Sequence, residues 1–391
     1  MATLPPNFTL LQVVPRLDAG GVERTTVDIS RAVVEAGGRS LVASEGGRFE
    51  GELADGGGEL VRLPVASKNP LTIWSNIGRL KRLIRAETVS LVHVRSRAPA
   101  FSALRAARRC GVPSISTYHG VYNARSDLKR WYNGVMTRAD HVIANSDYTR
   151  RHVLDAYDLP PERITAVARG SDLARFDPAA VSPDRIAAAR AAWGVGPDDG
   201  RTLFLLAGRL TRWKGQGLLV EAADRLKAQG RDDFVVVMIG DDQGRTAYRA
   251  EIEAMIGRAG LSPQVRLAGH FDDMPAAWLA ADVAVAPSLE PEAFGRTAVE
   301  PQLMGRPVIV AGHGAPLETV LDGETGWRFP PGDAGALADR MAQAIEAGEQ
   351  GRGAMGQAGL ARARRLYSLD AMIEATFAVY RDVLERAVLA R

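Results

Sequence analysis

The chain has 391 residues, of which 46% are hydrophobic and 24% are charged, and it contains a single cysteine. This length exceeds one ordinary core and fits two domains of about 150–200 residues each, while the composition excludes a disordered chain. One cysteine excludes an internal disulfide and a cysteine-based metal site, and it suits a reducing compartment. A formal net charge of +3 is too small to indicate nucleic-acid binding.

The chain shows no sign of export or of membrane insertion. Its first residues lack a basic leader before an apolar run, so we expect no signal peptide. No uncharged apolar run reaches 18 residues, so we expect no membrane-spanning helix. These observations predict a cytoplasmic protein.

The first half of the chain alternates between buried strands and amphipathic helices. A strand is predicted for 9–15, followed by a turn with Gly20 and Gly21 and by a helix that ends at Gly37. A second helix is predicted for 71–86, and further strands are predicted for 39–44, 60–64, 91–94, 114–118 and 141–145. Such alternation predicts an α/β fold with a doubly wound parallel sheet.

The second half repeats this pattern. Strands are predicted for 202–208, 234–240, 265–269, 282–286 and 306–312, again with helices between them. The stretch 176–200 is rich in Pro, Gly and Asp and is the best linker candidate. We therefore predict two Rossmann-like domains, 1–175 and 201–368. The last helix, 369–389, is amphipathic and fits either domain.

The clearest chemical signal lies in the stretch 286–309, which carries Glu292 in a loop and Glu300 in a helix that begins near Arg296. In one continuous helix these two acids would be about 12 Å apart along the axis and on different faces. We therefore expect Glu292 to overhang the end of the sheet while Glu300 reaches it from the helix. This arrangement suits a single ligand at the carboxyl edge of a parallel sheet.

Two cations form a second signal. Arg209 follows a predicted strand, and Lys214 stands with Gly215 at the start of the next helix. Two cations beside free helix N–H groups favour a diphosphate site, and the alternative is a pair of solvated surface cations. The Gly20–Gly21 turn offers a close backbone approach to phosphate or sugar, although such a turn is more often structural. No G-x-G-x-x-G follows either opening strand, so dinucleotide binding is not expected.

Two of the six histidines stand at strand ends. His119 ends the strand before Gly120, so we expect it to point into the crevice and to bond a sugar or a leaving oxygen. His270 holds the matching place in the second half, where a contact to a nucleotide base competes with a plain surface role. Acidic pairs elsewhere lack partners at metal-ligand spacing, so no metal site is expected. No G-x-S-x-G elbow indicates a serine hydrolase.

The helix over 73–85 combines an apolar stripe with a basic face. Its simplest interpretation is core packing with solvated arginines and lysines. The alternative is an interfacial helix that touches an anionic membrane, and further basic residues in the first half favour it.

With these features in place, the chain resembles the GT-B retaining glycosyltransferases of family 4 over nearly its whole length. The resemblance rests on the segments GGVER, PSISTYHG, VIANSDYTR, ARGSDLARFDP, AGRLTRWKGQ, PEAFGRTAVEPQLMGRPVIV and HGAPLETVLDGETGWRFPPGD. The most specific part is the E-x7-E signature formed by Glu292 and Glu300. Its combination with Arg209 and Lys214 makes the resemblance specific to this family.

For the donor site, the resemblance implies that Glu292 contacts the donor sugar and that Glu300 binds the ribose hydroxyls. Backbone groups of Ala293, Phe294 and Gly295 would close around the sugar. Arg296 and Thr297 are included among the donor-binding residues, although they replace an aliphatic pair that is more common in the family.

For the remaining positions, the resemblance implies that Arg209 and Lys214 hold the diphosphate. Gly20 and Gly21 would line the crevice, and His119 would lie near the donor sugar and the acceptor. The last helix, 369–391, would pack back on the N-terminal domain. A departure precedes the predicted linker, where Arg-Gly-Ser-Asp over 169–172 replaces Asn-Gly-x-Asp.

Together these features indicate a retaining transferase that moves a hexose-type sugar from a nucleoside diphosphate sugar to an acceptor hydroxyl, without a metal or other cofactor. Stabilisation of the departing diphosphate would supply most of the catalysis. The expected acceptor is a glycan or lipid-linked glycan of bacterial lipopolysaccharide core or another envelope polysaccharide, with peripheral contact to an anionic membrane as an option. The alternatives are a nucleotide-sugar epimerase or hydrolase on the same fold, and a non-catalytic sugar-nucleotide binding protein.

Overall fold

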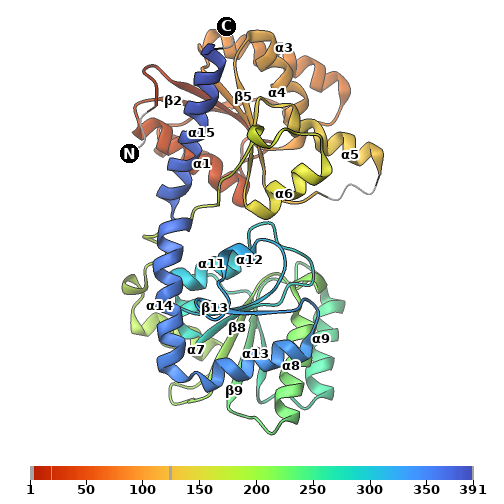
Figure 1. The fold of residues 1–391 in the computed structure, drawn as a ribbon, viewed down its shortest axis with the longest axis vertical. Coiled ribbons are helices and arrows are strands. Elements are labelled where there is room, and N and C mark those ends of the chain that lie inside the picture. The colour runs from red at the N-terminus through yellow and green to blue at the C-terminus, as the bar shows by residue number, and fades with distance from the viewer. Residues whose placement is uncertain (1–3, 19, 123–125, 390–391) are drawn as a thin grey trace. The chain divides into compact units, whose positions relative to one another are not determined.

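The computed structural model describes residues 4–18, 20–122 and 126–389. The chain divides into two compact units, which we call unit 1 (Met1–Gly170 with Leu369–Arg391) and unit 2 (Ser171–Ser368). Each unit is built around a parallel β-sheet with helices on both faces (Figure 1). The predicted pair of doubly wound sheets is therefore confirmed.

The sheet of unit 1 has the strand order β3-β2-β1-β4-β5-β6-β7, and all its described pairings are parallel. Its strands are β1 (Thr9–Val13), β2 (Arg39–Ser44), β3 (Glu59–Arg62), β4 (Leu91–Val94), β5 (Ser114–Tyr118), β6 (His141–Ala144) and β7 (Ile164–Ala166). The central strands β1, β4 and β5 are buried along their whole length because helices cover both faces of the sheet. The chain reverses its direction of travel across the sheet between β1 and β4, which is where such folds bind ligands.

Neighbouring residues of β1 point to opposite faces of this sheet and define two cores. Leu11 packs with α3 (Pro70–Ala86) and α4 (Arg97–Cys110), whereas Leu10 packs with α1 (Gly21–Glu35) and α15 (Leu369–Leu389). The shorter helices of unit 1 are α2 (Glu50–Asp55), α5 (Asp127–Asn133), η1 (Gly134–Arg138), α6 (Asp147–Ala156) and η2 (Pro161–Arg163).

The final helix, α15, completes the core of unit 1. Its side chains Phe377 and Tyr380 are buried against residues of the first strands and of α1. The Tyr380 hydroxyl lies 2.7 Å from Nδ1 of His93, whose Nε2 lies 2.7 Å from the Thr117 hydroxyl. A buried aromatic side chain with a satisfied hydroxyl fixes the helix in one position on the sheet.

The sheet of unit 2 has the order β10-β9-β8-β11-β12-β13 and reverses direction between β8 and β11. Its strands are β8 (Thr202–Ala207), β9 (Phe234–Ile239), β10 (Val265–Gly269), β11 (Val283–Ala286), β12 (Val308–Ala311) and β13 (Gly326–Phe329). Its helices are η3 (Pro178–Ala180), α7 (Pro183–Ala192), η4 (Arg212–Lys214), α8 (Gln216–Ala228), α9 (Thr246–Arg258), α10 (Met274–Ala280), α11 (Arg296–Leu303), α12 (Pro316–Thr319), α13 (Ala334–Glu346) and α14 (Gly348–Tyr367). The helices α8, α9 and α13 share one apolar core with the sheet.

The predicted linker over 176–200 contains regular structure. Its central part forms α7, which packs against α10, and Arg185 forms an ion pair of 2.7 Å with Asp273. Ser182 caps α7 by accepting a hydrogen bond from the backbone of Arg185, so the local sequence itself starts a helix there. The stretch therefore belongs to unit 2, which begins at Ser171.

Two strands escaped the sequence analysis. Both β7 and β13 are edge strands, of three and four residues respectively. Three residues are too few for a periodic pattern in β7, and β13 (Gly-Trp-Arg-Phe) lacks a continuous apolar run. Among the described helices, none is both long and apolar enough to cross a bilayer.

Candidate functional site

The candidate donor site lies in unit 2, where the loops after β8 and β11 leave neighbouring strands. The loop after β8 carries Arg209 and η4, and it turns at Gly215 into α8. Gly215 has a positive φ of 77°, and a Cβ there would lie 2.0 Å from the carbonyl oxygen of Pro287. Only glycine allows the two loops to approach this closely, and the approach places Lys214 beside the β11 loop.

Lys214 and Glu292 form the centre of this site. The Lys214 ammonium lies 2.8 Å from Glu292 Oε1, with side chains only 14% and 11% exposed. The Ser288 hydroxyl donates a 2.5 Å hydrogen bond to the same carboxylate oxygen. His313 Nε2 lies 2.8 Å from the Ser288 carbonyl oxygen. The charge-assisted bonds hold the acid and the base in a defined geometry.

The backbone around Glu292 is fixed as well. Its carbonyl oxygen accepts a 2.9 Å hydrogen bond from the backbone of Ala315. Gly314 adopts a φ of 68°, and a Cβ there would lie 2.7 Å from that oxygen. The glycine-rich turn after β12 therefore supports the acidic loop. His313 stands one residue before this turn, and the sequence analysis gave it no role.

Arg209 is the exposed cation of the site. Its backbone carbonyl accepts a 3.0 Å hydrogen bond from Gln216 Nε2, and Gln216 is fully buried. Across the described part of the chain, its guanidinium makes no hydrogen bond or ion pair with another side chain. A fixed backbone with an unpaired guanidinium is well suited to bind an anionic ligand.

Glu300 lies in the second turn of α11. Its side chain is 13% exposed, and the Arg296 guanidinium lies 3.7 Å from its carboxylate. Burial raises the pKa of Glu300, while Arg296 and Trp278 partly offset this rise. Hydroxyl groups of a ligand would stabilise a carboxylate at such a site, because their hydrogen bonds replace those of the water that burial removes.

The segment before α11 places the other predicted donor residues. Gly295 caps the helix in the left-handed conformation, with a φ of 78°. Phe294 is buried and makes an edge contact with Tyr367, with ring centroids 5.9 Å apart. Ala293 and Thr297 are half-buried on either side of this turn. Ala293, Phe294 and Gly295 therefore form the loop that follows Glu292, and Thr297 lies in the first turn of α11, before Glu300.

His270 is not part of this segment. It is exposed after β10, and its Nε2 lies 2.8 Å from Asp272 Oδ1. No described contact joins it to Glu292, Glu300, Arg209 or Lys214. β10 is an edge strand, separated from β11 by β9 and β8, and the donor role of His270 stays a prediction.

In unit 1, His119 lies just after β5. Both ring nitrogens are buried and have no hydrogen-bond partner among the described residues. Burial lowers the pKa of His119 well below its usual value, and the positive charges of Arg169 and Arg95 act in the same direction. The imidazole is therefore neutral at physiological pH.

Gly20 and Gly21 lie at the start of α1. A Cβ on Gly21 would stand 2.1 Å from a guanidinium nitrogen of Arg169, so Arg169 packs directly against this glycine. Arg169 also donates a 3.3 Å hydrogen bond to the His119 carbonyl oxygen. The glycine turn and His119 are thus brought together by Arg169, a residue at the position where the family pattern has Asn.

Sequence analysis missed a buried polar group next to His119. Arg95 is only 2% exposed, and its Nε donates a 2.7 Å hydrogen bond to Gln12 Oε1. Asn145, also 2% exposed, donates to the His119 carbonyl oxygen. Arg95 follows β4 and Asn145 follows β6 directly. The sequence did contain a signal for this group, because a polar residue stands at the end of each of these buried strands.

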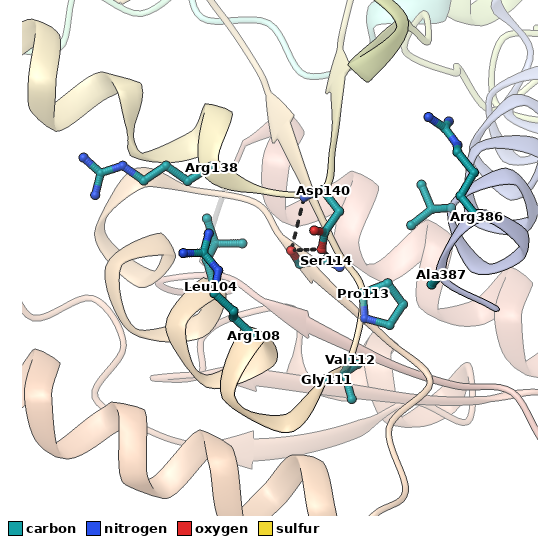
Figure 2. Close-up of a pocket in the computed structure, with 11 residues that line it drawn as sticks. Leu104, Arg108, Gly111, Val112, Pro113, Ser114, Arg138, Asp140, Arg386 and Ala387 are labelled. Carbon is teal, nitrogen blue, oxygen red and sulfur yellow. Dashed lines mark hydrogen bonds between the residues drawn. The ribbon is translucent and has the colours of Figure 1, made fainter. Parts of the chain in front are cut away.

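A separate cavity of about 440 Å³ lies at the opposite edge of the sheet in unit 1, where β5 begins. Figure 2 shows Arg108 and Arg138 on one side of it and Arg386 on the other. Asp140 accepts hydrogen bonds of 2.7 Å from the backbone nitrogen and the hydroxyl of Ser114. Ligands of doubly wound sheets bind at the carboxyl edge, so this cavity is not part of the candidate site.

No group of three or more His, Cys, Asp or Glu side chains among the described residues is placed to hold a metal ion.

Comparison with known proteins adds to this geometry. A family model described as Glycosyltransferase Family 4 matches residues 19–175, and one described as Glycosyl transferases group 1 matches residues 190–361. A solved glycosyltransferase from Rickettsia africae is 30% identical, with a TM-score of 0.88, and the alignment covers 97% of this chain and 99% of that one. The Anabaena protein Alr3699/HepE, solved in complex with UDP, is 22% identical with a TM-score of 0.80, and the alignment covers 96% and 99% of the two chains.

Among curated sequences, D-inositol 3-phosphate glycosyltransferase of Salinispora tropica is 32% identical over 303 residues. That alignment covers 71% of this chain and 61% of the relative. An alignment with a second such enzyme, from Catenulispora acidiphila, is 33% identical and covers 54% of this chain and 49% of that relative. The chain thus matches about half to three-fifths of the length of these curated relatives.

Proposed function

Because the chain belongs to glycosyltransferase family 4 and has the GT-B fold, we propose that it is a retaining transferase acting on a nucleoside diphosphate sugar. It moves a hexose-type sugar to an acceptor hydroxyl. The observation that carries this proposal is the Lys214–Glu292 ion pair beside the unpaired Arg209, at the point where the sheet of unit 2 reverses direction. Ligands of open α/β sheets bind at such points.

In the proposed mechanism, Arg209 and Lys214 stabilise the negative charge that develops on the departing diphosphate. Groups held in place before the reaction need no reorganisation, and this kind of electrostatic stabilisation is often the largest contribution to catalysis. Ser288 and His313 keep Glu292, and through it Lys214, in position. The acceptor hydroxyl attacks the anomeric carbon from the side of the leaving group, and a diphosphate oxygen takes its proton.

Glu292 and Glu300 have different tasks in this proposal. Glu292 accepts hydrogen bonds from hydroxyls of the donor sugar, together with the loop of Ala293, Phe294 and Gly295. Glu300 binds the ribose hydroxyls. The two acids are therefore not an acid/base pair of the kind that glycosidases use. His119 is proposed to bond the sugar as a neutral imidazole.

The acceptor is proposed to be a glycan or lipid-linked glycan, in lipopolysaccharide core or another envelope polysaccharide. Work at the inner face of the membrane is part of this proposal, and the basic residues of unit 1 support it. Neither a metal nor another cofactor is proposed to take part.

The donor is best tested by thermal unfolding of the full chain with UDP, GDP, ADP and their hexose derivatives, with and without added magnesium. A ligand at 100 times its Kd adds about 2.7 kcal/mol to the free energy of unfolding, so the right nucleotide stands out by its melting temperature. NMR of the product then reports whether the anomeric configuration is kept. Release of free sugar or of an epimer without any acceptor would contradict the transferase and support the hydrolase or epimerase.

A further inference from the structure

Unit 1 contains two neighbouring cavities that share Lys68, Ala98 and Tyr132. The first, which we call the basic pocket, has a volume of about 590 Å³. Its remaining described lining residues are Pro15, Ala66, Ser96, Arg97, Val121, Tyr122, Lys129 and Asn133. Several of them stand just after β1, β4 and β5, so the pocket lies at the carboxyl edge of the sheet, next to the point between β1 and β4 where the strand order reverses.

The basic pocket is prepared for an anion. Arg97 is held by a 2.6 Å hydrogen bond to Asn133 Oδ1, and its guanidinium carbon lies 3.9 Å from the centre of the Tyr122 ring. Lys68 and Lys129 are exposed, and their ammonium groups form no hydrogen bond or ion pair with the described residues. No Asp or Glu occurs among the described residues that line the pocket. One fixed and two free cations without a counterion attract phosphate or carboxylate.

The second cavity, which we call the apolar groove, has a volume of about 380 Å³ and lies between α3, α4 and α5. Its apolar lining residues are Pro70, Ile73, Trp74, Ile77, Ala98, Phe101, Trp131 and Tyr132. The Phe101 and Trp131 rings lie 5.3 Å apart, so they form a continuous wall. This volume is within the range of about 300–1,000 Å³ that small-molecule sites have.

The groove opens on a surface that is unusually apolar. Trp74 and Trp131 are 74% and 55% exposed, and Leu71 and Leu128 beside them are 78% and 74% exposed. Large apolar side chains gathered around a groove mark a place where apolar ligands or membranes bind. Tryptophan in particular prefers the boundary between hydrocarbon and water.

We propose that the acceptor is an anionic lipid whose charged head group occupies the basic pocket and whose hydrocarbon chain lies in the apolar groove. The shared residues Lys68, Ala98 and Tyr132 mark the boundary between its two halves. Ligands of doubly wound sheets bind at the carboxyl edge, and the basic pocket puts the head group at that edge of unit 1. This proposal rests on the proposed function and narrows its acceptor class.

Binding of single-chain alkyl phosphates to the full chain tests this proposal, with hexyl, octyl and decyl phosphate below their micelle concentrations. Each methylene that enters the groove should strengthen binding about fourfold. Decyl phosphate should therefore bind at least 100-fold more tightly than hexyl phosphate. Inorganic phosphate and the uncharged octyl glucoside should each bind at least tenfold more weakly than octyl phosphate.

Two pairs of variants distinguish binding of the charged head group from binding of the hydrocarbon chain. Ile73→Gln should reduce the gain per methylene, and Val388→Gln, an exposed apolar residue on α15, serves as its matched control. Lys68→Ala with Lys129→Ala should weaken all alkyl phosphates about equally, by tenfold or more. Arg82→Ala with Arg85→Ala removes the same charge from the exposed part of α3 and should leave binding unchanged.

Affinity that does not depend on chain length would overturn the lipid acceptor and indicate a water-soluble anionic acceptor instead. Equal binding of octyl glucoside and octyl phosphate would overturn the anionic head group. UDP-glucose and the other donors are proposed to bind unit 2, so donor binding tests the proposed function independently of the lipid acceptor. A protein that binds a donor but no alkyl phosphate contradicts only the lipid acceptor, whereas the reverse result contradicts the proposed transferase.

Discussion

The ammonium group of Lys214 lies 2.8 Å from a carboxylate oxygen of Glu292, although 78 residues separate the two in the chain. Both side chains are largely shielded from water, so removal of either one would leave the other charge buried and unpaired. In the proposed function, a donor diphosphate would share Lys214 with Glu292. This sharing would link the acid proposed to bind the sugar with the cation proposed to bind the diphosphate.

Replacement of Lys214 tests this arrangement. Lys214→Ala is expected to lower turnover by about 100-fold or more, because a fixed group that stabilises developing charge contributes on that scale. The far-ultraviolet circular dichroism spectrum should stay unchanged. Lys227→Ala, which removes the same charge from an exposed position on α8, should keep normal turnover. A folded Lys214→Ala protein with near-normal transfer would exclude the diphosphate role.

Replacement of Glu300 tests ribose binding and has a predictable effect on stability. Burial raises the pKa of Glu300, so the folded state keeps its proton to a higher pH than the unfolded chain does. The free energy of unfolding therefore falls as pH rises through this interval. Glu300→Gln removes that loss, and its melting temperature at pH 7 should exceed that of the wild type.

The same variant should bind the donor more weakly. The donor identified by thermal unfolding should also lose affinity for the wild type as pH falls towards the raised pKa, because protonation removes an acceptor of ribose hydrogen bonds. Glu300→Gln should show no such pH dependence. Calorimetric titration between pH 5 and pH 8 measures the donor affinity of the wild type and of the variant. If the variant bound the donor as tightly as the wild type at pH 8, Glu300 would not be the ribose-binding residue.

His119 should act without a change of charge. Its pKa lies well below the usual value because of burial and of Arg169 and Arg95, so no step near pH 6.5 in the rate of transfer should come from His119. His119→Asn should lower turnover and leave the shape of the pH profile unaltered. In the unfolded chain the imidazole gains a proton near pH 6.5, so the free energy of unfolding falls below that pH. His119→Asn should weaken this fall, and an unweakened fall would contradict the neutral imidazole.

Tyr380→Phe tests the attachment of α15 to unit 1. The variant leaves Nδ1 of the buried His93 without its 2.7 Å partner, which should cost about 1–3 kcal/mol in the free energy of unfolding. Tyr157→Phe is a suitable control, because the Tyr157 hydroxyl forms no hydrogen bond with the described residues. Urea denaturation of both variants measures the difference. An equal cost for the two would show that the hydroxyl of Tyr380 adds nothing to the packing of α15.

The sequence predicted the central strands well for a physical reason. Strands such as β8 and β9 are buried along their whole length, and apart from Thr202 each is a continuous apolar run that ends at a glycine. The same reasoning placed Arg209, Lys214 and Glu292 at strand ends and Glu300 on α11. Residues that follow neighbouring strands of a parallel sheet meet at one edge, so their proximity could be predicted.

Other features depend on contacts that no local pattern reports. The pairing of Lys214 with one oxygen of Glu292 depends on the close approach of Gly215 to Pro287, which only the folded loops reveal. His270 was given a donor role because it stands at a strand end, and the 2.8 Å contact of its ring with Asp272 could not be read from that position. The apolar groove combines α3, α4 and α5, and none of these helices alone differs from an ordinary amphipathic helix.

The placement of α15 also bears on how the protein is made. Unit 2 is one continuous stretch, Ser171–Ser368, so all of its residues are synthesised before α15. Unit 1, by contrast, begins first and receives the side chains that close one of its cores, Phe377 and Tyr380, only at the end. Until then the apolar face of α1 and the sheet lacks its cover. The half of the protein that is translated first is therefore the half that finishes folding last.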